Sequence, residues 1–186
     1  MRAVATLFLV TVAVVVQTTI VNRLPFEWGA GPDLVIAVVV AVALTTSPAA
    51  AAGCGFAAGL AVDVLPPAEH ALGRYALVLC LAAYTLALLH RNTGAVGALG
   101  GRPSVWAVAG TTAVTAAGVG VGYAAIGLIM GDPRVSLISA VVNILVGAAL
   151  TGLTAPLATF PLLRMREALS GGEHTTIQGF VSPGRW

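Results

Sequence analysis

The chain has 186 residues, of which 58% are hydrophobic and 9% are charged, and its mean hydropathy is +0.97. A soluble domain carries about a quarter charged residues, so this composition excludes the soluble globular class. The nine basic residues are all arginines scattered singly along the chain, which excludes a basic nucleic-acid-binding patch. The long apolar runs predict an all-α integral membrane protein embedded in a lipid bilayer.

The first apolar run covers residues 3–21, close to the roughly 20 residues that cross a bilayer core. Gln17 lies near the end of this run. Pro32 and Asp33 open the next run and fit the first two positions of a helix, where a missing backbone donor costs little and a carboxylate meets the positive helix end. The sequence therefore predicts a first span over 3–21 and a second helix that begins at Asp33.

The apolar stretch 33–65 would form a helix about 50 Å long, which is longer than a bilayer is thick. Ser47 and Pro48 interrupt it with a typical N-cap residue followed by a proline at the first helical position. We therefore divide the stretch into two antiparallel spans, 33–44 and 48–65. Both are at or below the usual span length, so they should tilt or be shielded by longer neighbours.

Three further spans complete the predicted domain and cover residues 75–89, 105–130 and 135–160. Pro156 predicts a kink near the end of the last one. The sequence thus predicts a single six-helix transmembrane domain over residues 1–163 and a polar tail over residues 164–186. With six spans, six arginines lie on the side of the termini and three on the other side, so the positive-inside rule predicts that both termini and the tail are cytoplasmic.

The third span carries small residues on one stripe, because Ala51, Gly55 and Gly59 recur at every fourth position and Asp63 follows. Small residues allow close approach of another helix where lipid removes the hydrophobic driving force. We predict packing against a partner's helix at Ala51, Gly55, Phe56 and Gly59. The rival use of the same stripe is internal packing against the first or the sixth span.

Two carboxylates, Asp33 and Asp63, are predicted to lie at the outer ends of adjacent spans, with Arg74 as their counter-ion. Asp63 is interpreted either as a structural tie to Arg74 or as part of a partner or substrate site. Asp33 is interpreted as a favourable charge at a helix start. Three polar side chains inside spans are predicted to form interhelical hydrogen bonds: Gln17, Tyr84 and Asn143.

The sequence offers no set of catalytic or metal-binding residues. It contains no H-E-x-x-H, no G-x-S-x-G and no carboxylate pair in the middle of a span, and its three histidines fall in three different links. Gly53, Gly55 and Gly59 lie inside a membrane helix, without the strand and aqueous crevice that a nucleotide-binding glycine turn needs. We expect no enzyme activity, no metal and no cofactor.

Short features follow one another in order over residues 1–90: Gln17, Pro32-Asp33-Leu34, Gly55-Phe56-Ala57-Ala58-Gly59-Leu60, Asp63, Leu72-Gly73, Tyr75-Ala76-Leu77 and Tyr84. In this order and spacing they resemble the rod shape-determining protein MreD family. Ala83 and Ala87 stand where the family often has glycine, and both are small. The last two spans match the family only in hydropathy and length.

The resemblance implies a non-enzymatic scaffold of the bacterial cell-elongation (rod) complex in the cytoplasmic membrane. Such proteins bind the single-span MreC and, through it, the glycosyltransferase and transpeptidase of lateral peptidoglycan synthesis, with the actin-like MreB on the cytoplasmic face. It also implies a six-helix fold like the substrate-binding subunits of energy-coupling-factor transporters. The alternative is a subunit of an ATP-driven vitamin-type transporter that binds a small solute in a pocket of Asp63, Tyr75 and Tyr84.

Overall fold

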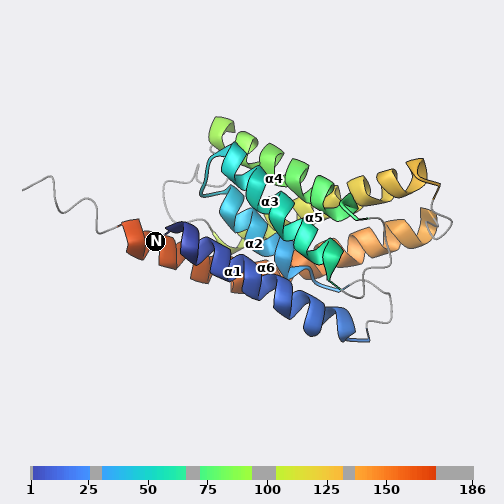
Figure 1. The fold of residues 1–186 in the computed structure, drawn as a ribbon, viewed down its shortest axis with the longest axis horizontal. Helices are drawn as coiled ribbons and strands as arrows, with labels where there is room; N and C mark the ends of the chain where they lie inside the picture. The colour runs from blue at the N-terminus through green and yellow to red at the C-terminus, as the bar shows by residue number, and fades with distance from the viewer. Residues whose placement is uncertain (1, 26–30, 66–71, 94–103, 132–136, 171–186) are drawn as a thin grey trace, which may run out of the picture.

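The computed structural model describes residues 2–25, 31–65, 72–93, 104–131 and 137–170. These residues are all-helical, with six α-helices and one short 3-10 helix packed into a single bundle (Figure 1): α1 (Arg2–Thr19), η1 (Val21–Arg23), α2 (Leu34–Ala43), α3 (Pro48–Val64), α4 (Arg74–Thr93), α5 (Val105–Ile129) and α6 (Leu137–Ser170). The first helix begins, and the last helix ends, at the same end of the bundle.

Four of these helices are long and apolar enough to cross a membrane, namely α1, α4, α5 and α6. The shorter helices α2 and α3 have 10 and 17 residues, which correspond to about 15 Å and 26 Å. Both are shorter than a hydrocarbon core of about 30 Å. The structure therefore contains the two short helices expected from the break at Ser47, and a crossing of the bilayer by all six helices stays a prediction.

Two helices extend further than the sequence predicted. α4 ends at Thr93 rather than at residue 89, and α6 continues through Pro156 to Ser170, into the segment predicted as a polar tail. A proline inside a helix removes one backbone donor and crowds the carbonyl four residues earlier, and helices in membranes tolerate it when the surrounding structure satisfies the freed carbonyl. The predicted residues 171–186 of the tail lie outside the described residues.

The short helix α2 is the centre of the bundle. Its residues from Val35 to Ala43 are all buried, and it contacts each of the other five α-helices. A helix that is apolar on every side suits such a position because it has no polar face to turn toward solvent. The longer helices thus shield α2 from lipid along its whole length.

The starts of the helices follow from local sequence. Ser47 is the N-cap of α3, its hydroxyl accepts from the backbone N–H of Ala50, and Pro48 follows it, which confirms the predicted division of the apolar stretch. Asp33 is the N-cap of α2 rather than its second residue. The cap position is favoured because the carboxylate can then accept the backbone N–H of Ile36.

The closest helix packing joins α3 to α4. A Cβ added at Gly55 would lie 2.7 Å from the carbonyl oxygen of Leu79, and one added at Gly59 would lie 2.5 Å from the Cα of Ala76. The small stripe therefore faces α4 of the same chain, and not the first or the sixth span as the internal-packing alternative had it. Its neighbour Phe56 is 46% exposed and lies on the outer surface.

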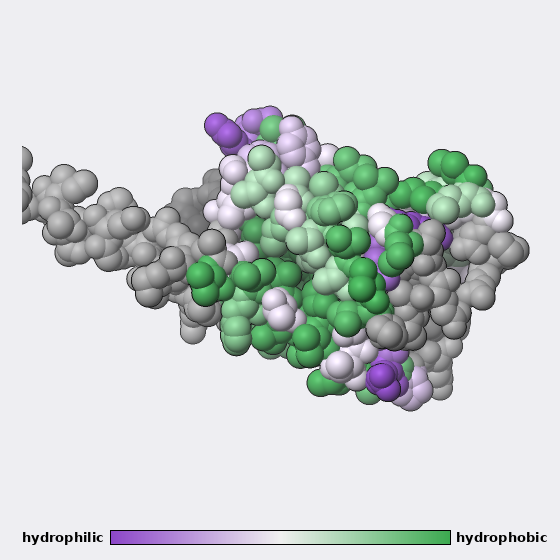
Figure 2. Space-filling view, in the orientation of Figure 1, coloured by the Kyte–Doolittle hydropathy of each residue, from purple (hydrophilic) through white to green (hydrophobic). Residues whose placement is uncertain are grey.

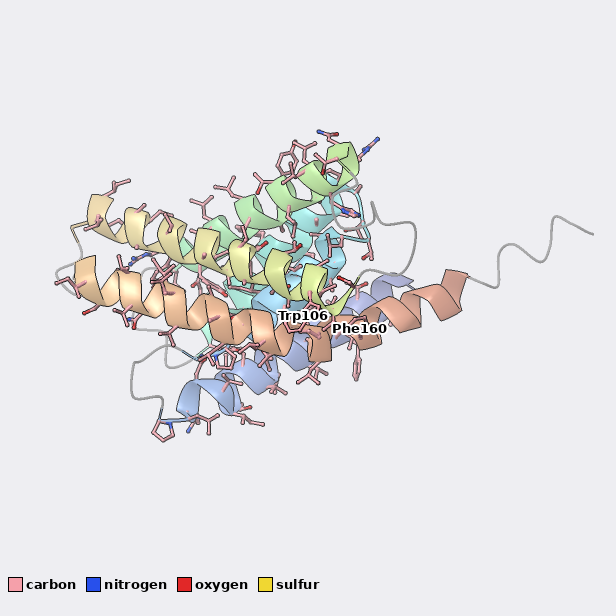
Figure 3. All side chains as sticks on the ribbon, turned by 180° about the vertical axis from the view of Figure 1, so that it is seen from behind. Trp106 and Phe160 are labelled. Atoms are coloured by element: carbon pink, nitrogen blue, oxygen red, sulfur yellow. The ribbon has the colours of Figure 1, made fainter. Side chains whose placement is uncertain are left out.

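The outer surface of the bundle is apolar, as expected for contact with lipid. Figure 2 shows hydrophobic residues over the middle of one face and hydrophilic residues gathered toward its ends. Trp106 of α5 and Phe160 of α6 lie at the same end of this helix pair (Figure 3), and Trp106 is 81% exposed. Tryptophan is enriched where the hydrocarbon core meets the headgroups, so this end fits a membrane interface.

The packing of Gly59 gives a first prediction. Gly59→Ala should lower the melting temperature of the detergent-purified protein, because the new Cβ meets backbone atoms of Ala76 that cannot turn aside, and overpacking typically costs about 1–3 kcal/mol. Gly53→Ala is the matched control, since nothing lies within 4 Å of a Cβ at that position. An unchanged melting temperature for Gly59→Ala would show that α3 and α4 are not in such close contact.

Candidate functional site

The N-terminus of α2 packs among the other helices, with Asp33 and Leu34 half-buried, and polar side chains satisfy its backbone N–H groups. The Oδ1 atom of Asp33 accepts from the N–H of Ile36 at 2.9 Å, and the Oε1 atom of Gln17 accepts from the N–H of Leu34 at 2.9 Å. The first acceptor belongs to the helix itself, and the second comes from α1. This arrangement places the carboxylate at the positive end of the α2 dipole.

Gln17 and Thr151 connect this helix start to the helices on either side. The amide nitrogen of Gln17 donates to the side-chain oxygen of Asn22 at 2.9 Å and to the carbonyl of Pro32 at 3.2 Å. The hydroxyl of Thr151 on α6 accepts from the N–H of Asp33 at 2.9 Å. Both side chains are buried, so α1 and α6 are held against the same turn of chain.

Tyr75 brings α4 to the same carboxylate. Its hydroxyl donates to the Oδ2 atom of Asp33. Its ring meets the ring of Tyr123 on α5 edge to face, with centroids 6.4 Å apart and planes inclined by 71°. One carboxylate thus receives donors from its own helix and from α4.

Asp63 supplies the N-terminal cap of α4 from the neighbouring helix. Gly73 occupies the cap position, since its carbonyl accepts the first intrahelical bond from Leu77, and glycine has no side chain that could act as a cap. The Oδ2 atom of Asp63 instead accepts from the N–H groups of Gly73 at 3.0 Å and Ala76 at 3.1 Å. The φ of Gly73 is +87°, a value that side-chain-bearing residues rarely adopt.

Arg74 follows this cap and reaches α5. Its Nε and Nη2 atoms donate to the carbonyl oxygen of Tyr123 at 3.1 Å and 2.7 Å. Its guanidinium carbon lies 3.8 Å from the centroid of the Tyr123 ring, a cation–π geometry. The side chain is only 6% exposed, so both contacts are made away from bulk solvent.

Together these residues form what we call the polar cluster, which includes a side chain from each α-helix or from its N-cap: Gln17, Asp33, Asp63, Arg74, Tyr75, Tyr123 and Thr151. Its groups bind helix ends and one another. In the part of the chain that the structure describes, no group of three or more histidine, cysteine, aspartate or glutamate side chains could hold a metal ion. The arrangement is suited to fixing helix positions.

The sequence predicted four of these seven residues as polar contacts. The structure brings Gln17, Asp33, Asp63 and Arg74 together. The guanidinium of Arg74 meets the carbonyl and ring of Tyr123, and its role as a counter-ion of the two carboxylates stays a prediction. Tyr75 was named only in the solute pocket of the transporter alternative, and Tyr123 and Thr151 were missed. The only available signal was a single tyrosine in a glycine-rich helix for Tyr123, whereas nothing distinguished Thr151 from the other threonines of the chain.

Two predicted interhelical hydrogen bonds are corrected by the structure. Tyr84 and Asn143 are both exposed on the outer surface of the bundle. Neither side chain bonds to another described residue. The sequence showed that each is polar within a span, but it did not show the direction in which each side chain points.

The cap from Asp63 gives a second prediction. Asp63→Ala should destabilise the protein by at least about 1 kcal/mol, because two backbone N–H groups at the start of α4 lose their acceptor. Asp63→Asn keeps an acceptor oxygen and should lose less. The melting temperatures of both variants in detergent measure the difference, and equal losses would argue against a capping role.

Tyr75 gives a third prediction. Tyr75→Phe removes only the hydroxyl that donates to Asp33 and should cost about 1–3 kcal/mol, because a half-buried carboxylate then loses one of its donors. Tyr84→Phe makes the same chemical change on the outer surface and should leave the melting temperature of the isolated protein unchanged. Equal effects of the two substitutions would contradict the assigned contact.

Comparison with known proteins identifies the family of this chain. No curated protein and no solved structure matches the chain. The family model described as rod shape-determining protein MreD matches residues 1–93, which is half of the chain and contains helices α1 to α4. The matched part carries Gln17, Asp33, Asp63, Arg74 and Tyr75 of the polar cluster, together with the close α3 to α4 contact. The chain therefore belongs to the rod shape-determining protein MreD family.

Proposed function

We propose that this protein is a non-enzymatic scaffold of the bacterial cell-elongation complex, which binds the membrane span of MreC and thereby helps to organise lateral peptidoglycan synthesis. The family match over residues 1–93 carries the proposal, since it identifies a rod shape-determining membrane protein. Contacts with the wall glycosyltransferase and transpeptidase are indirect in this proposal, and the actin-like MreB lies on the cytoplasmic side.

The polar cluster is consistent with a scaffold. Asp63 and Tyr75, which the transporter alternative would use to bind a solute, contribute hydrogen bonds to the N-terminus of α4 and to Asp33. A bundle whose polar groups fix its own helix ends can present a rigid surface to a partner. We therefore do not retain the small-solute-binding subunit as a second function.

The position in the membrane is part of the proposal. The end of the bundle where α1 starts and α6 ends would face the cytoplasm, because six of the nine arginines belong to that side. The polar cluster would then lie toward the outer face. The membrane would be the bacterial cytoplasmic membrane.

The partner's helix would contact the bundle on a surface other than the glycine stripe. Gly55 and Gly59 are covered by α4 of the same chain, and Ala51 is 0% exposed. Of the four residues predicted for partner-helix packing, Phe56 is the one that reaches the outer surface, at 46% exposed. We therefore keep Phe56 as a contact and assign the other three to internal packing.

Purification from native membranes tests the function, which is our fourth prediction. The tagged protein, extracted in mild detergent, should retain MreC and substoichiometric wall-synthesis enzymes, identified by mass spectrometry. Depletion of the protein should turn rods into spheres, and re-expression should restore the rods. Recovery of ATPase subunits with a second multi-span subunit, and unchanged rods on depletion, would instead support a transporter.

A further inference from the structure

The membrane helices of this chain differ in the length of their apolar runs. In α4 the run without charged or histidine side chains extends from Tyr75 to Leu89 and holds 15 residues, which form about 22 Å of helix. α5 has 25 residues from Val105 to Ile129, none of them charged, and is about 37 Å long. A hydrocarbon core is about 30 Å thick. α5 can fill such a core with a tilt, whereas the apolar run of α4 is too short to fill it.

The start of α4 marks one boundary of the hydrocarbon on the face that α3 and α4 share. α3 ends at Val64 and α4 begins at Arg74. Leu65 and Leu72 lie between them, are not helical, and are 38% and 71% exposed. Exposed backbone that is not helical does not occur within hydrocarbon, because its N–H and C=O groups find no partners there. The lipid hydrocarbon on this face therefore ends at the level of Arg74.

The end of α4 marks the other boundary. Arg91, Asn92 and Thr93 follow one another in the last turn, and all three are exposed. Charged and polar side chains on a lipid-facing surface belong at the membrane interface. The hydrocarbon beside α4 is thus about 22 Å thick, which is about 8 Å less than an ordinary core.

α5 and α6 continue beyond the level of Arg74. The Nη2 atom of Arg74 donates to the carbonyl oxygen of Tyr123 at 2.7 Å, so this residue of α5 lies level with the start of α4. From Tyr123 to the C-cap Met130 the chain continues for about 10 Å. A Cβ added at Gly120 would lie 2.8 Å from Cγ1 of Ile144, so the first turns of α6 accompany this extension. Figure 1 shows these ends of α5 and α6 reaching past the neighbouring ends of α3 and α4.

The extension is apolar and exposed. Leu128, Ile129 and Met130 are 54%, 86% and 59% exposed, and Ile138 at the start of α6 is 78% exposed. Such a surface is stable in lipid and unfavourable in water. A flat bilayer would leave this surface in water, or it would submerge the non-helical chain before α4 in hydrocarbon.

We propose that the bilayer around this chain is uneven, with full thickness along α5 and α6 and a compressed region along α3 and α4, where the surface of one leaflet bends inward to the level of Arg74. The α3 and α4 face therefore takes phospholipids whose acyl chains are short or disordered enough to fit the thinner core. Bilayers accommodate short apolar stretches by such thinning at modest cost. This inference goes beyond the proposed function, because it needs no protein partner.

Two exposed residues at one level of the bundle provide the test. A Cβ added at Gly122 would lie 3.0 Å from Cγ1 of Val78, so α4 and α5 meet at this level. The residues next to them, Leu77 on α4 and Val121 on α5, are 50% and 58% exposed. Leu77 is about 5 Å from the start of α4, whereas Val121 is more than about 10 Å from the end of α5. The uneven bilayer thus gives the two positions different depths, and a flat bilayer gives them the same depth.

Spin labels measure these depths. Leu77→Cys and Val121→Cys are made separately in the full chain with Cys54→Ala and Cys80→Ala, labelled with a nitroxide, and reconstituted in vesicles of phosphatidylethanolamine and phosphatidylglycerol with palmitoyl and oleoyl chains. The ratio of accessibility to oxygen and to a water-soluble nickel complex reports depth. The label at Val121 should lie at least about 5 Å deeper than the label at Leu77. Each labelled chain should keep the melting temperature of the wild type.

A control pair lies at the other end of the same helices. Leu88 on α4 is three residues before Arg91, and Gly110 on α5 is four residues after Trp106, the exposed tryptophan at the interface. Both positions are exposed. Labels on Leu88→Cys and Gly110→Cys should be equally shallow, because the thinning is expected at the polar-cluster end alone.

Three results would overturn the proposal. Equal, deep labels at Leu77 and Val121 would show a flat bilayer that covers the start of α4. Equal, shallow labels, with a label on Ile129→Cys as accessible to nickel as in water, would show that the ends of α5 and α6 project from the membrane. Spin–spin broadening at Val121 with low accessibility to both reagents would show that a second copy covers α5. None of these results bears on the scaffold function, which co-purification tests separately.

A second measurement avoids the cysteine substitutions. Leu77→Trp and Val121→Trp are made in the otherwise unchanged chain, and their fluorescence is compared with that of the wild type. Phospholipids brominated near the ends of the acyl chains should quench the added tryptophan at Val121 more strongly, and phospholipids brominated near the headgroup should quench the one at Leu77 more strongly. The same quenching profile at both positions would contradict the uneven bilayer.

Discussion

The rest of the structure depends on how the backbone N–H groups at the N-terminus of α2 are satisfied. This helix is about 15 Å long and lies at the centre of the bundle, so its first N–H groups begin inside protein and must be satisfied there. Asp33 meets them from the helix itself, Gln17 from α1 and Thr151 from α6, while Tyr75 on α4 bonds to the carboxylate. The hydrogen bonds that satisfy this one helix end therefore fix the positions of the neighbouring helices.

The first backbone N–H groups of α4 are also satisfied by a carboxylate, but here the turn and the carboxylate come from two different helices. Gly73 makes the turn at a positive φ and cannot cap, and Asp63 on α3 provides the missing acceptor. The turns at Gly55 and Gly59 then hold α3 against α4 so closely that a methyl group would meet backbone atoms. Cap and close packing thus fix this pair of helices. Asp63, interpreted from the sequence either as a tie to Arg74 or as part of a partner or substrate site, caps the start of α4.

This packing gives different roles to the interior and to the outer surface of the bundle. Small residues and charged residues near the polar cluster contact other parts of the same chain. The outer surface of the bundle is therefore the part available to other molecules. The middle of the face seen in Figure 2 is apolar and suits lipid. Tyr84 and Asn143 are the polar side chains predicted to join helices that instead lie on this surface.

The sequence by itself determined the class of protein, the family, the division of the apolar stretch at Ser47 and Pro48, and the residue types of four members of the polar cluster. These follow from local chemistry, since apolar length, capping residues and helix breakers act over a few neighbouring residues. Only the tertiary structure decided that Gly55 and Gly59 face α4, that Arg74 meets Tyr123, that Thr151 completes the cluster and that Tyr84 points outward. Helices that are apolar on all sides carry no periodic signal of which face is inside, so their rotation and partners are set by packing alone.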